Sequence, residues 1–308
     1  MTRSFLSVSD ISPTELDSIL TRTKRIKESI RSRGKIATLQ DVVVGLLFEK
    51  PSTRTSAGFE VATIRLGGQP LYFSSHDLQL SRGEPVKDTA RVLGFDLDGI
   101  VARVYSHETA YLLSLNSGIP VINGLSDLEH PSQIVSDLFT IQEMKGKLRG
   151  LNLAYIGDGD NVCNSLLLGS AMTGINMTVA CPKGYEPNRD VLARAQMNAK
   201  LMGSSLVVTS DPNEAAKKAD ILYTDVWVSM GEETETEKRM KAFSGYQINS
   251  ELLKLANDDA IVMHCLPAHR GLEITDDVIE GSQSAVWRQA ENKLHGAAGV
   301  LEFFLRKG

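Results

Sequence analysis

The fold is decided by Val42-Val43-Val44-Gly45-Leu46-Leu47-Phe48, which is followed at once by Glu49-Lys50-Pro51-Ser52-Thr53-Arg54-Thr55. The apolar run predicts a strand that is buried on both faces, as in a parallel sheet. A helix is predicted to begin at Ser52, whose hydroxyl caps the first turn while the next N–H groups point toward an anion. Arg54 adds a planar, permanently charged group that suits a phosphate or a polarised carbonyl. By itself such a motif is more often an ordinary helix cap with a solvated arginine, so the rest of the chain has to decide.

Apolar runs and amphipathic stretches alternate on both sides of this segment. A capping box at Ser12-Pro13-Thr14-Glu15 predicts a first helix that extends to about Ile30. The alternation that follows is typical of a parallel sheet covered by helices on both faces. The predicted strands of this half are 42–48, 70–73, 99–104 and 120–122, and the predicted helices are 52–66, 84–93 and 107–116.

The same rhythm restarts in the second half. A helical pattern from Pro131 to about Lys145 ends in Lys147-Leu148-Arg149-Gly150, a basic, glycine-marked stop that predicts a domain junction. The charged stretch Glu232–Lys241 is interpreted as a mobile loop leading into a short helix. A last amphipathic helix, from about Trp287 to Phe304, is predicted to fold back on the first domain. The predicted strands are 151–156, 176–180, 206–208, 221–224 and 260–263, with helices starting near 161, 187, 211 and 250.

Composition excludes several classes of function. The chain has 308 residues, a formal net charge of −5 and a pI near 5.8, which argues against nucleic acid or an anionic membrane as a partner. The N-terminus has no apolar signal region and the apolar runs are too short to span a bilayer, so a cytoplasmic protein is expected. The three cysteines, Cys163, Cys181 and Cys265, have neither zinc-type spacing nor the pattern of a disulfide framework.

Polar residues follow the predicted strands in both halves. Ligands of open α/β sheets bind beyond the carboxyl ends of the strands, so these residues predict one cleft between two doubly wound parallel-sheet domains. They are Arg103, His130-Pro131-Ser132-Gln133, Gly157-Asp158-Gly159-Asp160-Asn161, Asp225 and His264-Cys265-Leu266-Pro267.

Two rival interpretations are weaker. A dinucleotide site at Gly157-Asp158-Gly159 lacks the third glycine, which would fall at Val162, and the next strand has no acid to bind a ribose. Asn161 is instead expected to cap the following helix. Adjacent residues on an extended segment point to opposite faces, so His264 and Cys265 are not expected to share a metal ion, and a buried structural histidine is favoured.

Several motifs together closely resemble the ornithine carbamoyltransferases, in order and over nearly the whole chain. They are Phe48–Thr55, Asp88-Thr89-Ala90-Arg91-Val92-Leu93, Ala102-Arg103-Val104-Tyr105, Asn123-Gly124-Leu125-Ser126-Asp127, His130-Pro131-x-Gln133, Asp225-Val226-Trp227-Val228-Ser229-Met230-Gly231 and His264-Cys265-Leu266-Pro267-Ala268-His269-Arg270-Gly271. The resemblance implies transfer of a carbamoyl group from carbamoyl phosphate to L-ornithine, with no metal or organic cofactor. It also implies a carbamoyl-phosphate domain (1–134, with 287–308 packed on it), an ornithine domain (150–286) and a homotrimer, with assemblies of trimers left open.

The resemblance also assigns the site. The phosphate and carbamoyl group are expected to be bound by Ser52, Thr53, Arg54, Thr55, Arg103, His130, Gln133, Cys265, Leu266, Lys293 and Gln79 of a neighbouring subunit. Ornithine is expected at Asn161, Asp225, Ser229 and Met230, and the catalytic set at Arg54, Thr55, Arg103, His130, Gln133 and Cys265.

Three positions depart from the family's usual pattern: Ser56 and Lys293 stand where arginine is usual, and Asp160 where asparagine is usual. A carbamoyltransferase for another amine and a non-catalytic binding relative remain the alternatives.

Overall fold

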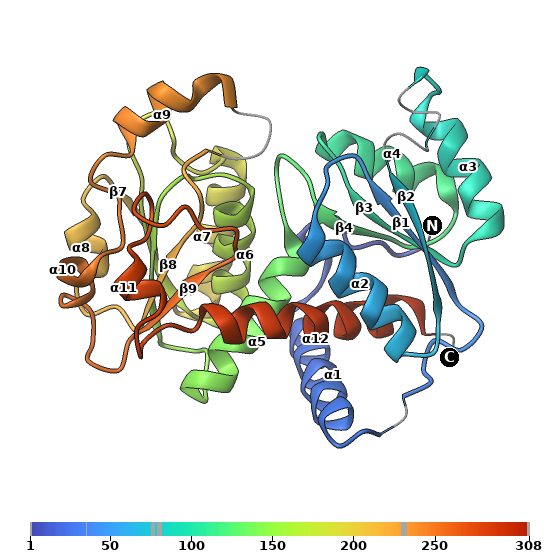
Figure 1. Ribbon diagram of the computed structural model, residues 1–308, viewed down its shortest axis with the longest axis horizontal. Coiled ribbons are helices and arrows are strands. Elements are labelled where there is room, and N and C mark those ends of the chain that lie inside the picture. The colour runs from blue at the N-terminus through green and yellow to red at the C-terminus, as the bar shows by residue number, and fades with distance from the viewer. Residues whose placement is uncertain (1, 35, 75–77, 79–81, 229–232, 307–308) are drawn as a thin grey trace. The chain divides into compact units, whose positions relative to one another are not determined.

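The computed structural model describes residues 2–34, 36–74, 78, 82–228 and 233–306 (Figure 1). The chain divides into two compact units, 1–139 with 291–308, and 140–290. Each unit contains one sheet whose strands are all parallel. The prediction of two doubly wound α/β sheets is therefore confirmed.

The sheet of the first unit has the strand order β2-β1-β3-β4. Because β1 lies between β2 and β3, the direction of winding reverses between β1 and β3. Such a reversal is where open sheets bind their ligands. The strands are β1 (Val43–Phe48), β2 (Gln69–Ser74), β3 (Gly99–Arg103) and β4 (Val121–Leu125), and the helices are η1 (Val8–Asp10), α1 (Pro13–Arg31), α2 (Thr53–Arg65), α3 (Val86–Asp96) and α4 (His107–Ser117).

Helices pack on both faces of this sheet. Ile100 of β3 packs in a core cluster with residues of α3 and α4. The neighbouring Gly99 faces the other side, where Leu305 of α12 (Val286–Leu305) lies so close that a Cβ on Gly99 would meet it at 2.5 Å. Phe304 of the same helix stacks on Phe5 with ring centroids 5.3 Å apart. The last part of α12 thus belongs to the core of the first unit.

Close contacts of small residues hold α12 in place. A Cβ on Gly299 would lie 2.1 Å from Thr23 Oγ1 of α1, and one on Gly296 would lie 2.2 Å from Ser136 Oγ of α5 (Pro131–Lys145). Any larger residue at these two positions would push α12 away from both helices. The buried Glu302 adds ion pairs to Arg22 and Arg25.

The sheet of the second unit has the order β7-β6-β5-β8-β9, and its winding reverses between β5 and β8. One face packs in a core cluster that includes Ile156, Leu222 and Val262 together with Ala216 and Ile279. Its strands are β5 (Asn152–Ile156), β6 (Asn176–Ala180), β7 (Leu206–Thr209), β8 (Ile221–Thr224) and β9 (Ile261–His264), and its helices are α6 (Asn161–Thr173), α7 (Arg189–Met202), α8 (Pro212–Ala216), η3 (Glu233–Glu235), α9 (Thr236–Ala242), α10 (Ser250–Leu253) and α11 (Asp276–Ile279).

The predicted elements correspond to the observed ones, with ends that shift by a few residues. The short helix predicted near Lys241 is α9. The short helices η1 and α11 carry too few residues to show a period and were not predicted. Among the described residues, no helix combines the length and apolar character that crossing a membrane requires.

Candidate active site

The turn from β1 into α2 forms a capped helix start. Ser52 is the N-cap residue, and its hydroxyl accepts a hydrogen bond from the N–H of Thr55 at 3.3 Å. Ser56 follows one turn on and donates to the carbonyl of Ser52 at 2.7 Å. The predicted cap is therefore confirmed, and Ser56 has a local structural role. The positive end of the α2 dipole adds to the charge of Arg54 at this position.

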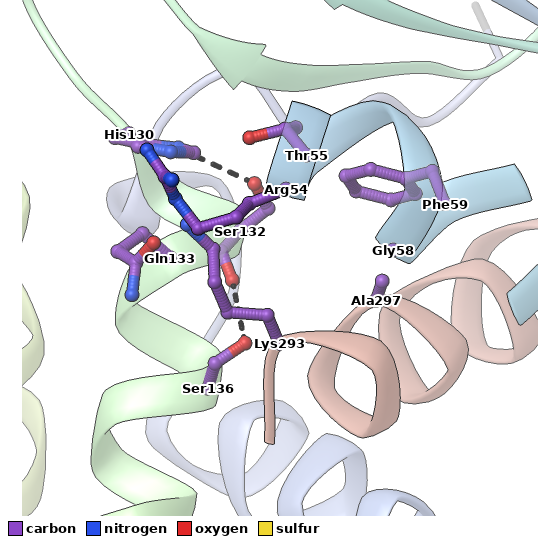
Figure 2. A pocket seen from close by; sticks show the side chains of 10 residues that line it. All are labelled: Arg54, Thr55, Gly58, Phe59, His130, Ser132, Gln133, Ser136, Lys293 and Ala297. Atoms are coloured by element: carbon purple, nitrogen blue, oxygen red, sulfur yellow. Dashed lines mark hydrogen bonds between the residues drawn. The ribbon is translucent and has the colours of Figure 1, made fainter. Parts of the chain in front are cut away.

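A pocket lies at this helix start (Figure 2). Three segments that are distant in sequence form its walls: the start of α2, the start of α5 and one turn of α12. The lining residues are Arg54, Thr55, Gly58, Phe59, His130, Ser132, Gln133, Ser136, Lys293 and Ala297, all of the first unit.

The pocket combines cations with unsatisfied polar atoms. Arg54 Nε is buried and has no hydrogen-bond partner among the described residues, and neither has Gln133 Oε1. Buried polar groups are normally satisfied, so orphaned atoms that line a pocket point to a polar ligand. With two cationic side chains and a helix N-terminus around them, that ligand is an anion.

His130 is electrically neutral in this environment. Burial lowers its pKa well below the ordinary value, and the positive charges of Lys293 and Arg103 lower it further. Its Nδ1 lies 3.4 Å from Ser132 Oγ, a long contact that Figure 2 shows. A neutral imidazole next to two cations can donate a hydrogen bond without adding a third charge.

A contact with α1 fixes the turn of α12 that carries Lys293. Lys27 is buried and donates to Asn292 Oδ1 at 2.6 Å, with Glu291 at 3.6 Å. This contact fixes the turn of α12 that carries Lys293 into the pocket.

The predicted residues of the first unit are only partly among those that line the pocket. Arg54, Thr55, His130, Gln133 and Lys293 line it, whereas Ser52, Thr53 and Arg103 do not. Arg103 is nevertheless buried and near enough to act on the pKa of His130. Gln79 lies outside the described residues. Ser132, which was predicted only as one of the polar residues that follow a strand, also lines the pocket. Sequence reasoning missed Gly58, Phe59, Ser136 and Ala297, although the spacing 132, 133, 136 on one helical face could have indicated Ser136.

In the second unit, a loop after β5 and one after β8 lie at the point where the winding reverses. Asp225 is buried, and one of its oxygens accepts from the N–H of Val226 at 2.8 Å.

The N-cap of α6 is Asp160, whose carboxylate accepts from the N–H of Val162, so the prediction that Asn161 is the cap is wrong. Asp160 is the cap because its carboxylate reaches forward to the N–H of Val162 in the first turn, while Asn161 is the first helical residue. Ser229 and Met230 lie outside the described residues.

Gly159 has a packing role. A Cβ at this position would lie 2.3 Å from the backbone nitrogen of Pro187 and 2.6 Å from the carbonyl oxygen of Tyr185. The loop after β5 therefore needs glycine in order to pass the segment before α7. Packing therefore explains the presence of Gly159, one of the two glycines that suggested a dinucleotide-binding site.

His264 is a buried structural histidine. Its Nδ1 accepts from the N–H of Leu266 at 2.9 Å, and its Nε2 lies 3.0 Å from a carboxylate oxygen of the buried Glu273. Its own N–H donates to Gln289 Oε1. The imidazole therefore shapes the turn that carries Cys265 and Leu266.

The expectation that His264 and Cys265 point apart is wrong. Ligand atoms of His264, Cys265 and Asp225 lie within 4.8 Å of one another. The reason is that β9 ends at His264 and the chain turns sharply, with a φ of 59° at Leu266, so the alternation of an extended strand no longer applies. Both ring nitrogens of His264 already have partners, and a metal ion would have to displace one of them.

Comparison with known proteins identifies the class. Residues 3–143 match the family model "Aspartate/ornithine carbamoyltransferase, carbamoyl-P binding domain", and residues 149–304 match "Aspartate/ornithine carbamoyltransferase, Asp/Orn binding domain". Together the matches span both units and define a two-domain carbamoyltransferase.

Individual relatives narrow the assignment. The chain is 49% identical to the ornithine carbamoyltransferase of Methanosarcina acetivorans over 306 residues, covering 99% of this chain and 100% of that one. It is 52% identical to that of Methanocaldococcus jannaschii over 282 residues, covering 91% and 92%. The solved ornithine carbamoyltransferase of Pyrococcus furiosus has a TM-score of 0.95 at 46% identity, with 98% and 97% covered. The chain therefore belongs to the ornithine carbamoyltransferase family.

Proposed function

We propose that the chain transfers the carbamoyl group of carbamoyl phosphate to the δ-amine of L-ornithine, giving L-citrulline and phosphate. The observation that carries the proposal is the anion pocket of the first unit, where a helix N-terminus, Arg54, Lys293 and the neutral His130 surround an unsatisfied amide oxygen. A phosphate with a carbamoyl group attached supplies the anion, the carbonyl and the N–H donors that such a pocket can bind.

The residue chemistry agrees with direct transfer. The neutral amine attacks the carbamoyl carbon, the new C–N bond forms, and the C–O bond to phosphate breaks with its electron pair on the phosphate. The amine nitrogen gives up one proton, which the departing phosphate takes. Negative charge grows on the carbonyl oxygen and then on the phosphate, and fixed cations and donors stabilise both. Arg54, Arg103 and His130 are assigned this role. Holding two substrates in line supplies roughly 7–11 kcal/mol of barrier reduction, so no covalent intermediate is required.

The second unit is assigned to ornithine. Asp225 accepts from the α-ammonium group, and Cys265 with Leu266 orients the δ-amine and carbamoyl group. The family model that matches this unit is described as an Asp/Orn binding domain. A buried carboxylate at position 225 favours a substrate with an additional ammonium group over aspartate.

A choice among amines tests the assignment. Ornithine, aspartate, putrescine and Nα-acetylornithine are supplied at equal concentration with carbamoyl phosphate, and the carbamoylated products are separated and quantified. Citrulline is expected to dominate by at least about 100-fold. Aspartate and Nα-acetylornithine lack the second ammonium group that would pair with the buried Asp225, a loss of several kcal/mol, and putrescine lacks the α-carboxylate. Equal use of putrescine would favour the alternative of another amine, and no product with any amine would favour a non-catalytic relative.

The rate of the chemical step is expected to rise with pH between 6 and 9. Only the neutral δ-amine can attack, so the rate follows its deprotonation. Burial lowers the pKa of His130 well below its ordinary value, so this residue is neutral across that range. Its titration is therefore not expected to appear in the dependence of the rate on pH. Single-turnover citrulline formation measures the step, and a flat profile would contradict the requirement for a neutral amine.

His130 also predicts a loss of stability in acid. Its pKa in the folded state is below the unfolded value of about 6.5, so the unfolded chain binds a proton first as the pH falls. The free energy of unfolding is therefore expected to decrease as the pH drops below about 6.5, and His130→Asn should reduce this dependence. Urea unfolding at pH 5 and 7 measures it, and an identical pH dependence in the two proteins would contradict the buried neutral state.

Lys293→Arg is expected to lower the KM for carbamoyl phosphate. Lysine keeps the charge in the pocket but lacks the two-pronged geometry with which arginine binds a phosphate. Steady-state kinetics at saturating ornithine gives the comparison. Lys24→Arg, at an exposed lysine of α1, is the matched control. An unchanged KM would show that the position tolerates either cation.

We further propose a cytoplasmic homotrimer that works in arginine biosynthesis. Exposed apolar side chains on α3 and α4, among them Phe95, Tyr111 and Leu115, support self-association through the first unit. A solved relative at 41% identity with a TM-score of 0.93, covering 99% of both chains, is the anabolic enzyme of Campylobacter jejuni. Sedimentation velocity is expected to show a trimer that Phe95→Glu dissociates, and a wild-type monomer would contradict the assembly.

A further inference from the structure

The amide of Gln133 is held in one orientation by a buried carboxylate. Gln133 Nε2 donates to Asp137 Oδ1 at 2.8 Å, and the two residues lie one turn apart on α5. Both are inaccessible to solvent, with exposed fractions of 1% and 0%. Because the NH₂ group of the amide donates to Asp137, the amide oxygen occupies the opposite end of the group.

The opposite end of the amide is then an acceptor without a partner. Gln133 Oε1 is buried and, among the described residues, receives no hydrogen bond. Figure 2 shows this oxygen on the side of His130 and Arg54, with the nitrogen turned away from them. The pocket therefore offers a buried amide acceptor, held in one orientation, next to the positive charges of Arg54 and Lys293.

We infer that Asp137 is a positioning residue that makes Gln133 select a ligand with an N–H donor next to its phosphate. The inference rests on the proposed function, because the carbamoyl NH₂ group is the donor that fits. Acetyl phosphate has the same phosphate and carbonyl but presents a methyl group, so it would leave Gln133 Oε1 buried and unpaired. Sites built to hydrogen-bond a group reject analogues that lack it far more strongly than apolar pockets reject a size change.

Asp137→Asn tests the inference through three ligands of the same pocket. The asparagine side chain can donate as well as accept, so the Gln133 amide becomes free to turn. We measure the KM for carbamoyl phosphate, and the competitive inhibition constants of acetyl phosphate and inorganic phosphate against it. The KM is expected to rise about tenfold, in line with loss of one buried hydrogen bond. The two inhibition constants and the KM for ornithine are expected to stay within about twofold.

Matched variants separate orientation from stability. Leu138 is buried next to Asp137 and does not line the pocket. Leu138→Val therefore weakens the packing of the same turn, and it should leave the ratio of the acetyl phosphate constant to the carbamoyl phosphate KM unchanged. Gln133→Leu removes the acceptor and should reproduce the selective loss, and adding Asp137→Asn to it should cause no further selective loss. If Asp137→Asn does not fold, Gln133→Leu alone carries the test of the acceptor.

Three outcomes overturn the inference: all three constants rising together in Asp137→Asn, no change in the carbamoyl phosphate KM, or a further selective loss in the double variant. Failure of the proposed function is distinguishable, because in that case the wild type forms no citrulline. A wild type that forms citrulline, with an Asp137→Asn variant of unchanged selectivity, would overturn the inference alone.

Discussion

Arg54→Ala is expected to reduce kcat/KM for carbamoyl phosphate by about three orders of magnitude. The guanidinium stands at the N-terminus of α2, where its charge and the helix dipole act on the same anion. Its Nε is buried and has no partner within the described part of the chain, so the group is positioned for a ligand. Removing a preorganised charge that acts on a transition state typically costs about 10²–10³ in rate, and loss of ground-state binding adds to it.

The control for this variant is Arg65→Ala. Arg65 is an exposed arginine in the last turn of the same helix, so its removal changes net charge equally while leaving the pocket untouched. Arg54→Lys should recover part of the activity, because it keeps the charge and loses the planar fork. Activity of Arg54→Ala within tenfold of the wild type would contradict the assigned role.

Asp225→Asn is expected to reduce kcat/KM for ornithine by about 10²–10³ while leaving the KM for carbamoyl phosphate within about twofold. Asp225 is buried at the end of β8, so the ammonium it would accept loses its charged partner in a site shielded from water. Steady-state kinetics with each substrate varied in turn gives both constants. The selectivity of the loss is the decisive feature, because a folding defect would affect both substrates.

Asp259→Asn is the matched control for the second unit. Asp259 is exposed and pairs with Lys145, so its replacement removes an acidic group at a position without a proposed ligand. Unchanged kinetics are expected there. An Asp225→Asn variant that binds ornithine normally and binds carbamoyl phosphate poorly would contradict the assignment of the amine to this unit.

The fold could be predicted from the sequence because the hydrophobic pattern and the helix caps indicate the same helices and strands. The run that ends at Phe48 and the cap at Ser52 predicted both β1 and the start of α2. The ends of elements were less well predicted, since they depend on hydrogen bonds that composition does not reveal. At α6, Asp160 and Asn161 are both acceptable caps, and only the backbone path decides between them.

The pocket was only partly accessible from sequence. Arg54, His130 and Gln133 are recognisable because charged or amide groups next to strand ends rarely serve a core. Phe59 and Ala297 line the pocket through packing alone, and nothing in their residue type indicates it. The short distance between the side chains of His264 and Cys265 was likewise not predicted. It depends on a turn with positive φ at Leu266, and leucine rarely adopts that conformation, so the sequence does not indicate the turn.

Product stoichiometry tests most directly whether the chain transfers the carbamoyl group to ornithine. The wild-type protein is incubated with carbamoyl phosphate labelled at the carbonyl carbon and with L-ornithine, and labelled citrulline and released phosphate are quantified together, with Arg54→Ala in parallel. One citrulline is expected for each enzyme-dependent phosphate, and the rate of citrulline formation by the variant is expected to be about 10³ lower. Release of phosphate without citrulline, or equal citrulline formation by the two proteins, would contradict the transfer.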